Sequence, residues 1–256
     1  MLNMADALHK HPEPSNEELQ KKIAELEELN RTKNSLLSFA AHQMKAPLGI
    51  VKGYATLFRE GQYGEVSEKQ TEVLRKIEFT ADELVDLLAN VIDLKKIEEG
   101  KMEYEFSKTD LVGLAKDAVD GIKLLAENKK LELALSAPTK NIFVQADPRE
   151  LKHVIQNLLD NAIKYTPSGF IRVEVKDAGG EAVFSVTDSG MGMSADAKPF
   201  LFNEFVRGNQ AGGEIKGSGI GLHIAKSIVN AHGGKIWAES DGEGKGSTFF
   251  FSLKKA

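Results

Sequence analysis

His42 has the chemistry of a nucleophile and lies in a segment with strong helical periodicity. Apolar residues recur around it in alternating steps of three and four, which predicts a helix that packs one seam against partner helices. The seam consists of Leu37, Ala40, Met44, Leu48, Val51, Ala55 and Phe58. His42 lies on the opposite side, so we expect its imidazole to face solvent, although an ordinary surface histidine would show the same pattern.

Three residues that follow His42 favour a docking surface. Pro47 lacks a backbone N–H and favours a bend in the helix. Gly49 and Gly53 each cost a helix interior about 0.5–1 kcal/mol relative to alanine. Bare backbone is useful where another backbone must come close, so we interpret this helix as a place where a second molecule docks.

A helix predicted over residues 148–165 carries polar side chains that could bind a metal and phosphate. It begins with a capping aspartate, Asp147, followed by a proline at the first helical position. A rotation of about 100° per residue puts Asn157, Asn161 and Lys164 on one face, opposite a broad apolar stripe. Amide oxygens suit Mg2+ and a lysine suits phosphate. A plain solvated face is the alternative explanation.

Two glycine-rich segments could hold the rest of a nucleotide. In the first, residues 186–193, Asp188 stands at the end of a predicted strand, where its carboxylate could accept a hydrogen bond from an exocyclic amine. Gly190 and Gly192 would let a ligand lie against the backbone. The spacing differs from the Rossmann fingerprint, and an Asp-Ser-Gly sequence can also be a simple turn.

The second segment runs directly into an apolar helix predicted over residues 224–231. Backbone N–H groups at such a helix start form a cradle for a polyphosphate. The segment consists of Gly217, Ser218, Gly219, Ile220, Gly221 and Leu222. The polar stretch at 208–214 is expected to be a mobile lid, and Arg207 beside it could contact phosphate.

The composition is that of a soluble globular protein, with 41% hydrophobic and 28% charged residues. The 33 basic residues against 38 acidic ones give a net charge of -5, which leaves no basic footprint for nucleic acid. The lack of cysteine excludes disulfides and a cysteine nucleophile. Without a signal-peptide core or a bilayer-spanning apolar run, we expect a cytoplasmic fragment whose full-length parent could be membrane-anchored.

The first hundred residues predict a helical hairpin. Residues 1–15 show no period and are expected to be a disordered terminus. Residues 16–35 carry a coiled-coil seam that continues into the His42 helix, so we predict one long rod. Residues 36–100 read as two helices joined by a turn at 61–64, the second beginning at a capping box. A hairpin cannot cover its own apolar faces, so we predict a homodimer with a four-helix bundle.

Residues 101–256 alternate short strands with helices, which predicts an α/β sandwich. A helix is expected over 110–128, with Leu111, Leu114, Ala118, Ile122 and Leu125 facing inward. Strands are expected at 102–106, 131–135, 142–145, 170–175, 182–187, 235–239 and 247–253.

The order of these motifs closely resembles the catalytic core of sensor histidine kinases, over about residues 35–256. The segments similar to that family's H, N, G1, F and G2 boxes are, in order, His42 to Pro47, Asn157 to Tyr165, Asp188 to Gly192, Phe202 to Phe205 and Gly217 to Leu222. Gly244 to Phe249 looks like the family's last glycine-rich element.

The resemblance implies a multidomain α and α+β protein. A long helical hairpin would form a dimeric four-helix bundle, followed by an α/β sandwich of the Bergerat type, which gyrase-type ATPases and heat-shock chaperones share. The implied activity is autophosphorylation of His42 with ATP and Mg2+, followed by transfer to an aspartate of a response regulator. A sensor or other signal input would lie upstream, outside this chain.

The resemblance also implies a role for each site residue. Asp188 would bind the adenine amino group, Tyr165 would stack on the ring, and Asn161, helped by Asn157, would hold Mg2+. The residues implied for the phosphates and the rest of the nucleotide are Lys164, Gly190, Gly192, Phe205, Arg207, Gly217, Ser218, Gly219, Gly221 and Leu222.

Two positions depart from the family pattern. An acidic residue usually follows the histidine and orients or deprotonates it, whereas Gln43 can only form hydrogen bonds. This favours slower kinase activity or a base elsewhere. Ala46 replaces the threonine or asparagine associated with dephosphorylating the response regulator, so we expect weak or absent phosphatase activity.

Two other functions are compatible with parts of the pattern. An ATPase or chaperone of the same nucleotide fold would share the Asn161, Asp188 and Gly217 features but would not need an outward-facing His42. A dimeric scaffold that binds nucleotide or a regulator without turnover is conceivable because of Gln43. Acid-labile, alkali-stable phosphate on the protein would separate the kinase from both.

Overall fold

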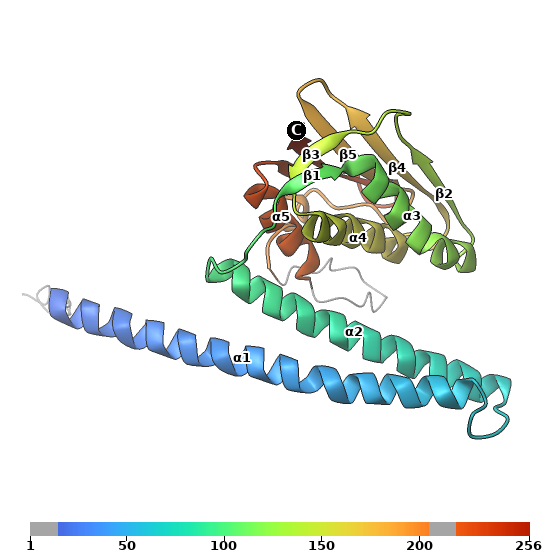
Figure 1. Cartoon of the computed structure of the whole chain (residues 1–256), viewed down its shortest axis with the longest axis horizontal. Coiled ribbons are helices and arrows are strands. Elements are labelled where there is room, and N and C mark those ends of the chain that lie inside the picture. The colour runs from blue at the N-terminus through green and yellow to red at the C-terminus, as the bar shows by residue number, and fades with distance from the viewer. Residues whose placement is uncertain (1–14, 205–218) are drawn as a thin grey trace, which may run out of the picture.

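A computed structural model describes residues 15–204 and 219–256 and shows a helical hairpin followed by an α/β domain (Figure 1). Helix α1 (Asn16–Arg59) is one helix of 44 residues, so the predicted rod and the His42 helix are continuous. Ser15 and Glu18 form a capping box at its start. Pro47 lies inside this helix without ending it.

Helix α2 (Glu68–Glu98) begins at the predicted capping box of Ser67 and Gln70. The turn before it contains two glycines with positive φ, Gly61 at 77° and Gly64 at 115°, a backbone conformation that favours glycine. Lys52 pairs with Asp82 at 2.7 Å, farther along the antiparallel pair of helices. The hairpin is thus set by local capping and turn chemistry.

The contact between α1 and α2 covers only part of the predicted seam, including Ala55. Ala41 and Ala55 of α1 and Ala81 of α2 are buried. Met44 and Val51, which belong to the predicted seam, remain 49% exposed within one chain. The reason is that one partner helix covers only a narrow face of α1, so the rest of the seam has no cover in a single copy.

The α/β domain contains two sheets. Strands β1 (Ser107–Asp110) and β3 (Phe143–Ala146) pair antiparallel. The larger sheet has the order β2-β4-β5-β7-β6, in which β2 and β4 are parallel and the other pairs antiparallel. Its strands are β2 (Leu131–Ser136), β4 (Gly169–Asp177), β5 (Glu181–Asp188), β6 (Lys235–Glu239) and β7 (Ser247–Lys254).

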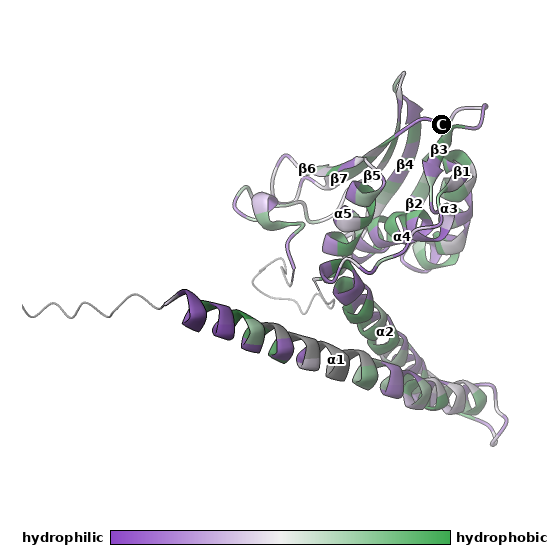
Figure 2. Ribbon diagram, turned by 60° about the vertical axis from the view of Figure 1, so that its left-hand side comes forward, coloured by the Kyte–Doolittle hydropathy of each residue, from purple (hydrophilic) through white to green (hydrophobic). Residues whose placement is uncertain are grey.

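Three helices pack on one side of the larger sheet (Figures 1 and 2). They are α3 (Leu111–Asn128), α4 (Pro148–Tyr165) and α5 (Gly221–Ala231). A short 3₁₀ helix, Lys198–Phe200, lies between β5 and α5. Phe184 and Phe251 stack at 5.0 Å in the core between the layers. The α+β class and the two-part architecture predicted from the sequence are confirmed.

Two local predictions are wrong. Residues 102–106 are extended but form no strand, because pairing begins only at Ser107, opposite Ala146. Leu125 is 52% exposed rather than inward. The buried face of α3 keeps the predicted Leu111, Ala118 and Ile122. It ends at Ala126 rather than Leu125, because four residues after Ile122 return to the same side of the helix.

The hairpin is attached to the α/β domain through the end of α2. Leu94 is 6% exposed, and Val91 and Ile97 pack against the core of the domain. Helix α2 contacts α5 there. No helix in the described ranges is both long enough and apolar enough to cross a membrane.

Candidate nucleotide and phosphoacceptor site

Helix α4 carries the two asparagines on its partly exposed face. Its N-cap, Asp147, accepts hydrogen bonds from the backbone N–H groups of Arg149 at 2.9 Å and Glu150 at 3.3 Å. The opposite face is completely buried. Because the stripe of leucines and valines fixes the rotation of the helix, the asparagines must face away from the core. The same burial explains why its bounds match the prediction from the sequence.

Asn157 joins α4 to the start of α5. Its Nδ2 donates to the carbonyl of His153 at 3.2 Å. Its Oδ1 lies so close to Gly221 that a Cβ at that glycine would overlap it. The first asparagine and the second glycine segment, far apart in the sequence, therefore lie in one place.

Strand β5 ends at Asp188, a residue that is only 4% exposed. Its Oδ1 accepts the backbone N–H of Gly190 at 2.8 Å. Burial raises the pKa of Asp188 above its ordinary value, although hydrogen bonds from the backbones of Gly190 and Ser247 and the nearby Thr166 hydroxyl oppose this. A buried carboxylate held ready in this way suits a polar ligand group.

Thr166 is a residue that the sequence analysis missed. Its hydroxyl is fully buried, faces the Asp188 carboxyl and completes no hydrogen bond of ordinary geometry with the described part of the chain. Buried hydroxyls in proteins are normally paired. Its position directly after Tyr165, at the C-terminal cap of α4, was the available signal in the sequence.

The first glycine segment is packed backbone against backbone. A Cβ at Gly190 would overlap the carbonyl of Tyr165, to which Met191 N–H donates at 3.1 Å. The Gly246 N–H in turn donates to the Gly190 carbonyl at 3.1 Å. Gly192, at φ 68°, has no room for a Cβ beside Gly242. These glycines are therefore required by the fold itself.

Some of the remaining predicted site residues lie in the part of the chain that the structure describes, and others do not. Gly219 has a φ of 71°, Gly221 begins α5, and Leu222 is partly buried. Lys164 Nζ lies 5.2 Å from the centroid of the Tyr165 ring. Asn161 is partly exposed on the same face as Asn157. The other four predicted residues, Phe205, Arg207, Gly217 and Ser218, lie outside the described residues.

Taken together, this donor set fits a nucleotide. A buried carboxylate beside an unpaired hydroxyl can recognise an exocyclic amine, and the N-terminus of α5 offers backbone N–H groups to phosphate. The amide oxygens of Asn157 and Asn161 are of the type that Mg2+ accepts. Hydrogen-bond acceptors for a nucleobase therefore lie at the C-terminal end of α4. Polar groups for a charged ligand lie along the same helix.

His42 lies on a different part of the molecule. Its side chain is exposed on α1, as are those of Gln43 and Ala46. No atom lies within 4 Å of a Cβ built at Gly49 or Gly53, so the surface beyond the histidine is open. The α/β domain contacts the hairpin through α2, and α1 runs on the far side of α2 (Figure 1).

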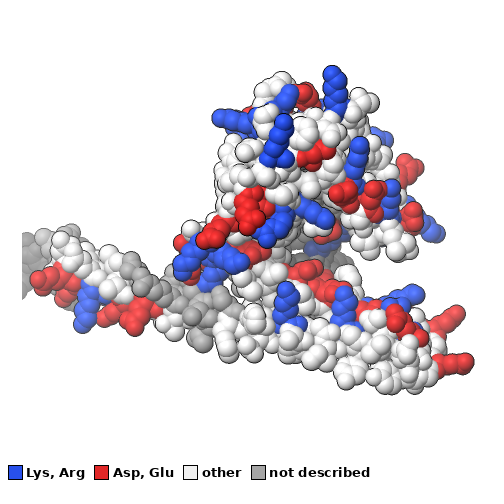
Figure 3. Space-filling view, viewed as in Figure 1, with Lys and Arg blue, Asp and Glu red and all other residues white. Residues whose placement is uncertain are grey.

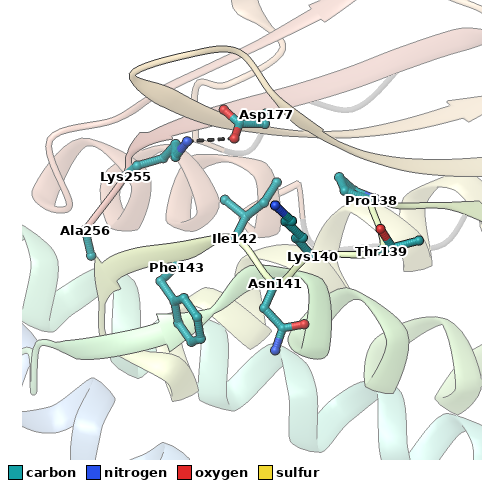
Figure 4. Close-up of a pocket in the computed structure, with 9 residues that line it drawn as sticks. All are labelled: Pro138, Thr139, Lys140, Asn141, Ile142, Phe143, Asp177, Lys255 and Ala256. Carbon is teal, nitrogen blue, oxygen red and sulfur yellow. Dashed lines mark hydrogen bonds and ion pairs between the residues drawn. The ribbon is translucent and has the colours of Figure 1, made fainter.

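A cavity of about 400 Å³ lies elsewhere on the α/β domain (Figure 4). It is bordered by the ion pair of Asp177 and Lys255 at 2.6 Å and by the 138–143 segment. None of the predicted nucleotide residues lines it. The size of a cavity therefore does not mark the candidate site in this protein.

Two families match consecutive parts of the chain. Residues 32–100 match the His Kinase A (phospho-acceptor) domain. Residues 146–256 match the family of histidine kinase-, DNA gyrase B-, and HSP90-like ATPases. The chain is thus a phosphoacceptor hairpin joined to an ATPase-type domain.

Curated relatives match almost the whole of this chain. The chain is 31% identical to the circadian input-output histidine kinase CikA of Synechococcus elongatus, over 91% of this chain and 31% of that protein. It is 33% identical to the sensor protein KdpD of Clostridium acetobutylicum, over 93% of this chain and 26% of that protein. The chain spans less than a third of the length of these two relatives.

A solved structure agrees with this pattern. The structure of full-length ShkA in complex with AMPPNP matches with a TM-score of 0.68 and 25% identity, over 87% of this chain and 46% of that one. The chain belongs to the sensor histidine kinases and contains their catalytic core.

Proposed function

We propose that this chain uses ATP to phosphorylate His42 and then passes the phosphoryl group to an aspartate of a response regulator. The observation that carries this proposal is the combination, in one chain, of an exposed imidazole on a helical hairpin and one site assembled from α4, β5 and α5. An ATPase or chaperone would need only the second. The family matches and the AMPPNP complex of ShkA support the same assignment.

In this proposal the nucleotide lies along α4. Asp188 and Thr166 recognise the adenine amino group, and Tyr165 stacks on the base. Asn161, with Asn157, holds Mg2+, which neutralises phosphate charge when bound. Lys164, Arg207 and the loop from Gly217 to Gly221 contact the phosphates, with Phe205, Gly190, Gly192 and Leu222 shaping the pocket.

The reaction needs positioning more than covalent assistance. A neutral ring nitrogen of His42 attacks the γ-phosphorus in line, the bond from that phosphorus to the β–γ bridging oxygen breaks, and ADP leaves. The ring proton is lost to solvent or a nearby base. Gln43 can orient the ring by a hydrogen bond but cannot take this proton, so we expect slower phosphorylation than an acidic residue would allow.

The hairpin also supplies the partner surfaces. Residues 36–100 of two chains would form a four-helix bundle, with residues 16–35 as a signalling helix and residues 101–256 as the ATP-binding domain. A response regulator would dock on the open surface at Gly49 and Gly53, next to His42. Signal input and any membrane anchor would belong to parts of a longer protein.

Incubation with γ-labelled ATP and Mg2+ tests the proposal. Label should appear on the protein, resist alkali and be lost in acid. His42→Ala should abolish it, and Asn161→Ala should reduce it at least about a hundredfold by removing the metal contact. His11→Ala is the matched control and should keep the label. Label that persists in His42→Ala would contradict the acceptor assignment and favour another function for the ATPase fold.

A further inference from the structure

His232 occupies the C-terminal cap of α5 and is tied to two backbones at once. Its Nδ1 lies 2.7 Å from the carbonyl of Ile228, which can only accept a hydrogen bond. Its Nε2 lies 3.0 Å from the backbone N–H of Asp147, which can only donate. The two contacts together require a neutral ring with its proton on Nδ1.

Asp147 is a second junction beside this ring. The residue is completely buried. One carboxylate oxygen caps α4, and the other, Oδ2, accepts the backbone N–H of Glu105 at 2.8 Å. Burial alone would raise the pKa of Asp147, but these hydrogen bonds lower it overall. The start of α4 is thereby joined to the segment that leads from α2 into the α/β domain.

Aromatic side chains of that same segment close over the imidazole. The Tyr104 ring meets the His232 ring edge-on at 5.2 Å, and the Phe106 ring lies 4.8 Å away. Residues 101–106 form no strand, so side-chain contacts such as these and the Glu105 hydrogen bond help to hold the interdomain segment in place. We call the group of Tyr104, Glu105, Phe106, Asp147 and His232 the latch.

The latch lies at one end of the packed pair of helices α4 and α5. The end of α5 meets the start of α4 at His232 and Asp147, whereas the start of α5 meets the middle of α4 at Gly221 and Asn157. The two contacts are separated by ten residues of α4, or about 15 Å. The antiparallel pair therefore connects the interdomain segment to the proposed phosphate-binding end.

We propose that His232 is a positioning residue whose neutral form fastens the interdomain segment to both nucleotide-binding helices, and whose protonation releases that segment. A proton on Nε2 would point at the N–H of Asp147 and remove the acceptor. The imidazolium would also attract the Asp147 carboxylate away from Glu105 N–H. This inference concerns regulation and rests on the proposed kinase function.

The charges around the ring set the direction of the response. Burial lowers the pKa of His232 below its usual value near 6.5, and the nearby Asp147 carboxylate partly opposes this. Other titratable or charged groups of the latch and around it are the Tyr104 phenol, the Glu105 carboxyl, Arg149 and Glu150 of α4 and Asp93 of α2. Since the folded-state pKa is depressed, the latch is fully stable above the ordinary histidine pKa and weakens as the pH falls below it.

Amide hydrogen exchange, without nucleotide, tests the latch directly. In the parent, protection of the Asp147 and Glu105 amides should fall by up to about tenfold between pH 7.5 and 5.5, after correction for intrinsic exchange, while β5 amides stay protected. His232→Gln keeps a side-chain acceptor that does not titrate. In this variant the Asp147 and Glu105 amides should stay protected at both pH values. His232→Phe keeps only the aromatic packing. In this variant the same two amides should be unprotected at both pH values.

Several outcomes would overturn the inference. One is a Gln variant that loses protection with pH as the parent does, and another is a Phe variant protected as well as the parent at pH 7.5. If the substitutions also reduce protection of the β5 amides, the 15N chemical shifts of the His232 ring in the parent test the inference instead, because they report the tautomer. A neutral Nδ1–H form at pH 7.5 supports the latch, and an Nε2–H form overturns it.

The kinase assay tests the regulatory consequence separately. A domain on an unfastened tether is presented less often to His42. At pH 5.5 and saturating ATP, the parent should therefore phosphorylate His42 about threefold more slowly than His232→Gln, with equal rates at pH 8 and a similar KM for ATP. Equal rates at both pH values would overturn the regulatory role. A missing phosphohistidine in every variant would instead refute the proposed function and leave the exchange result standing.

Discussion

Asp188 shows how a residue of the proposed nucleotide site can work against the stability of its own fold. The raised pKa of this carboxyl means that the charged form is disfavoured in the folded protein. For an acid with a raised pKa, the folded state gains stability as the pH falls through that pKa and bears the cost of the charge above it. The position therefore favours a neutral side chain for folding, whereas the proposed recognition of an amino group needs a carboxylate.

We expect Asp188→Asn to stabilise the chain and to abolish nucleotide binding. The gain is about 1.4 kcal/mol for each unit by which the pKa is raised, and it should appear as a higher midpoint in urea at pH 7. The matched control is Asp177→Asn, since the Lys255 hydrogen bond keeps the pKa of that exposed carboxyl low. It should leave nucleotide binding intact and bring no gain in stability. Tight nucleotide binding by Asp188→Asn would contradict the assignment.

Ala46 gives a second prediction for a single residue. Its methyl group is exposed one turn beyond His42 and cannot position a water molecule. We expect Ala46→Thr to accelerate dephosphorylation of a phosphorylated response regulator by about tenfold or more, with autophosphorylation little changed. Ala46→Val, which has the same shape without the hydroxyl, is the control. An unchanged rate with threonine would refute this explanation.

Residues such as Thr166 show where sequence analysis fails at this scale. The sequence indicates Asn157, Asn161 and Asp188, because polar residues in mid-helix or at a strand end are unusual in themselves. Thr166 is ordinary by type and becomes notable only because the end of α4 lies against the end of β5. A contact between distant segments cannot be inferred from either segment alone.

Elements were predictable where their signals were local. Helix α4 begins and ends where the sequence predicts, because Asp147, Pro148 and the apolar stripe act within one segment. The Ser67 cap of α2 is the same case. Residues 102–106 show the opposite, because a strand exists only with a partner, and here the aromatic side chains pack on His232 instead.

The meeting of α4 and α5 gives a prediction for elements. A Cβ at Gly221 would overlap Oδ1 of Asn157, so Gly221→Ala should displace that amide and weaken Mg2+-nucleotide binding by about tenfold, or 1.4 kcal/mol. Gly121→Ala is the matched control in α3, where a Cβ has open space. It should stabilise the chain by about 0.5–1 kcal/mol and leave binding unchanged. Titration calorimetry and urea unfolding measure the two effects, and equal affinity in Gly221→Ala would refute the contact.

At the scale of the whole molecule, the single chain leaves much apolar surface uncovered. Exposed hydrophobic side chains occur along both helices of the hairpin, among them Met44, Val51 and Phe58 of the predicted seam. Figure 3 shows a broad uncharged surface on the side of the hairpin turned away from the α/β domain. Patches of this kind mark interaction surfaces, which supports the proposed dimer.

We expect Val51→Glu to break that dimer. Burying an unpaired carboxylate in a helix interface should raise the dimer dissociation constant by at least about a hundredfold, or 2.7 kcal/mol. Gly49→Glu is the control, because it lies on the His42 side of α1 in open space. It should remain dimeric and slow phosphotransfer to the regulator. Sedimentation equilibrium measures the first effect, and a dimeric Val51→Glu would place the interface elsewhere.

The placement of the two domains could not be predicted from motifs. It depends on Val91, Leu94 and Ile97, which by type are ordinary apolar residues of a helix. In the structure these residues pack against the core of the α/β domain. A pattern within one helix cannot indicate such a contact with another domain. The same limit applies to the latch, whose parts come from three separate segments.

Strand β7 lies in the interior of the larger sheet, between β5 and β6. The loop just before it carries Gly246, whose N–H donates to the Gly190 carbonyl and where a Cβ would overlap the carbonyl of Asp188. A truncation that removes this strand would therefore also remove one wall of the proposed nucleotide site, even with every earlier box in place. Nucleotide binding would thus report whether β7 has joined the sheet.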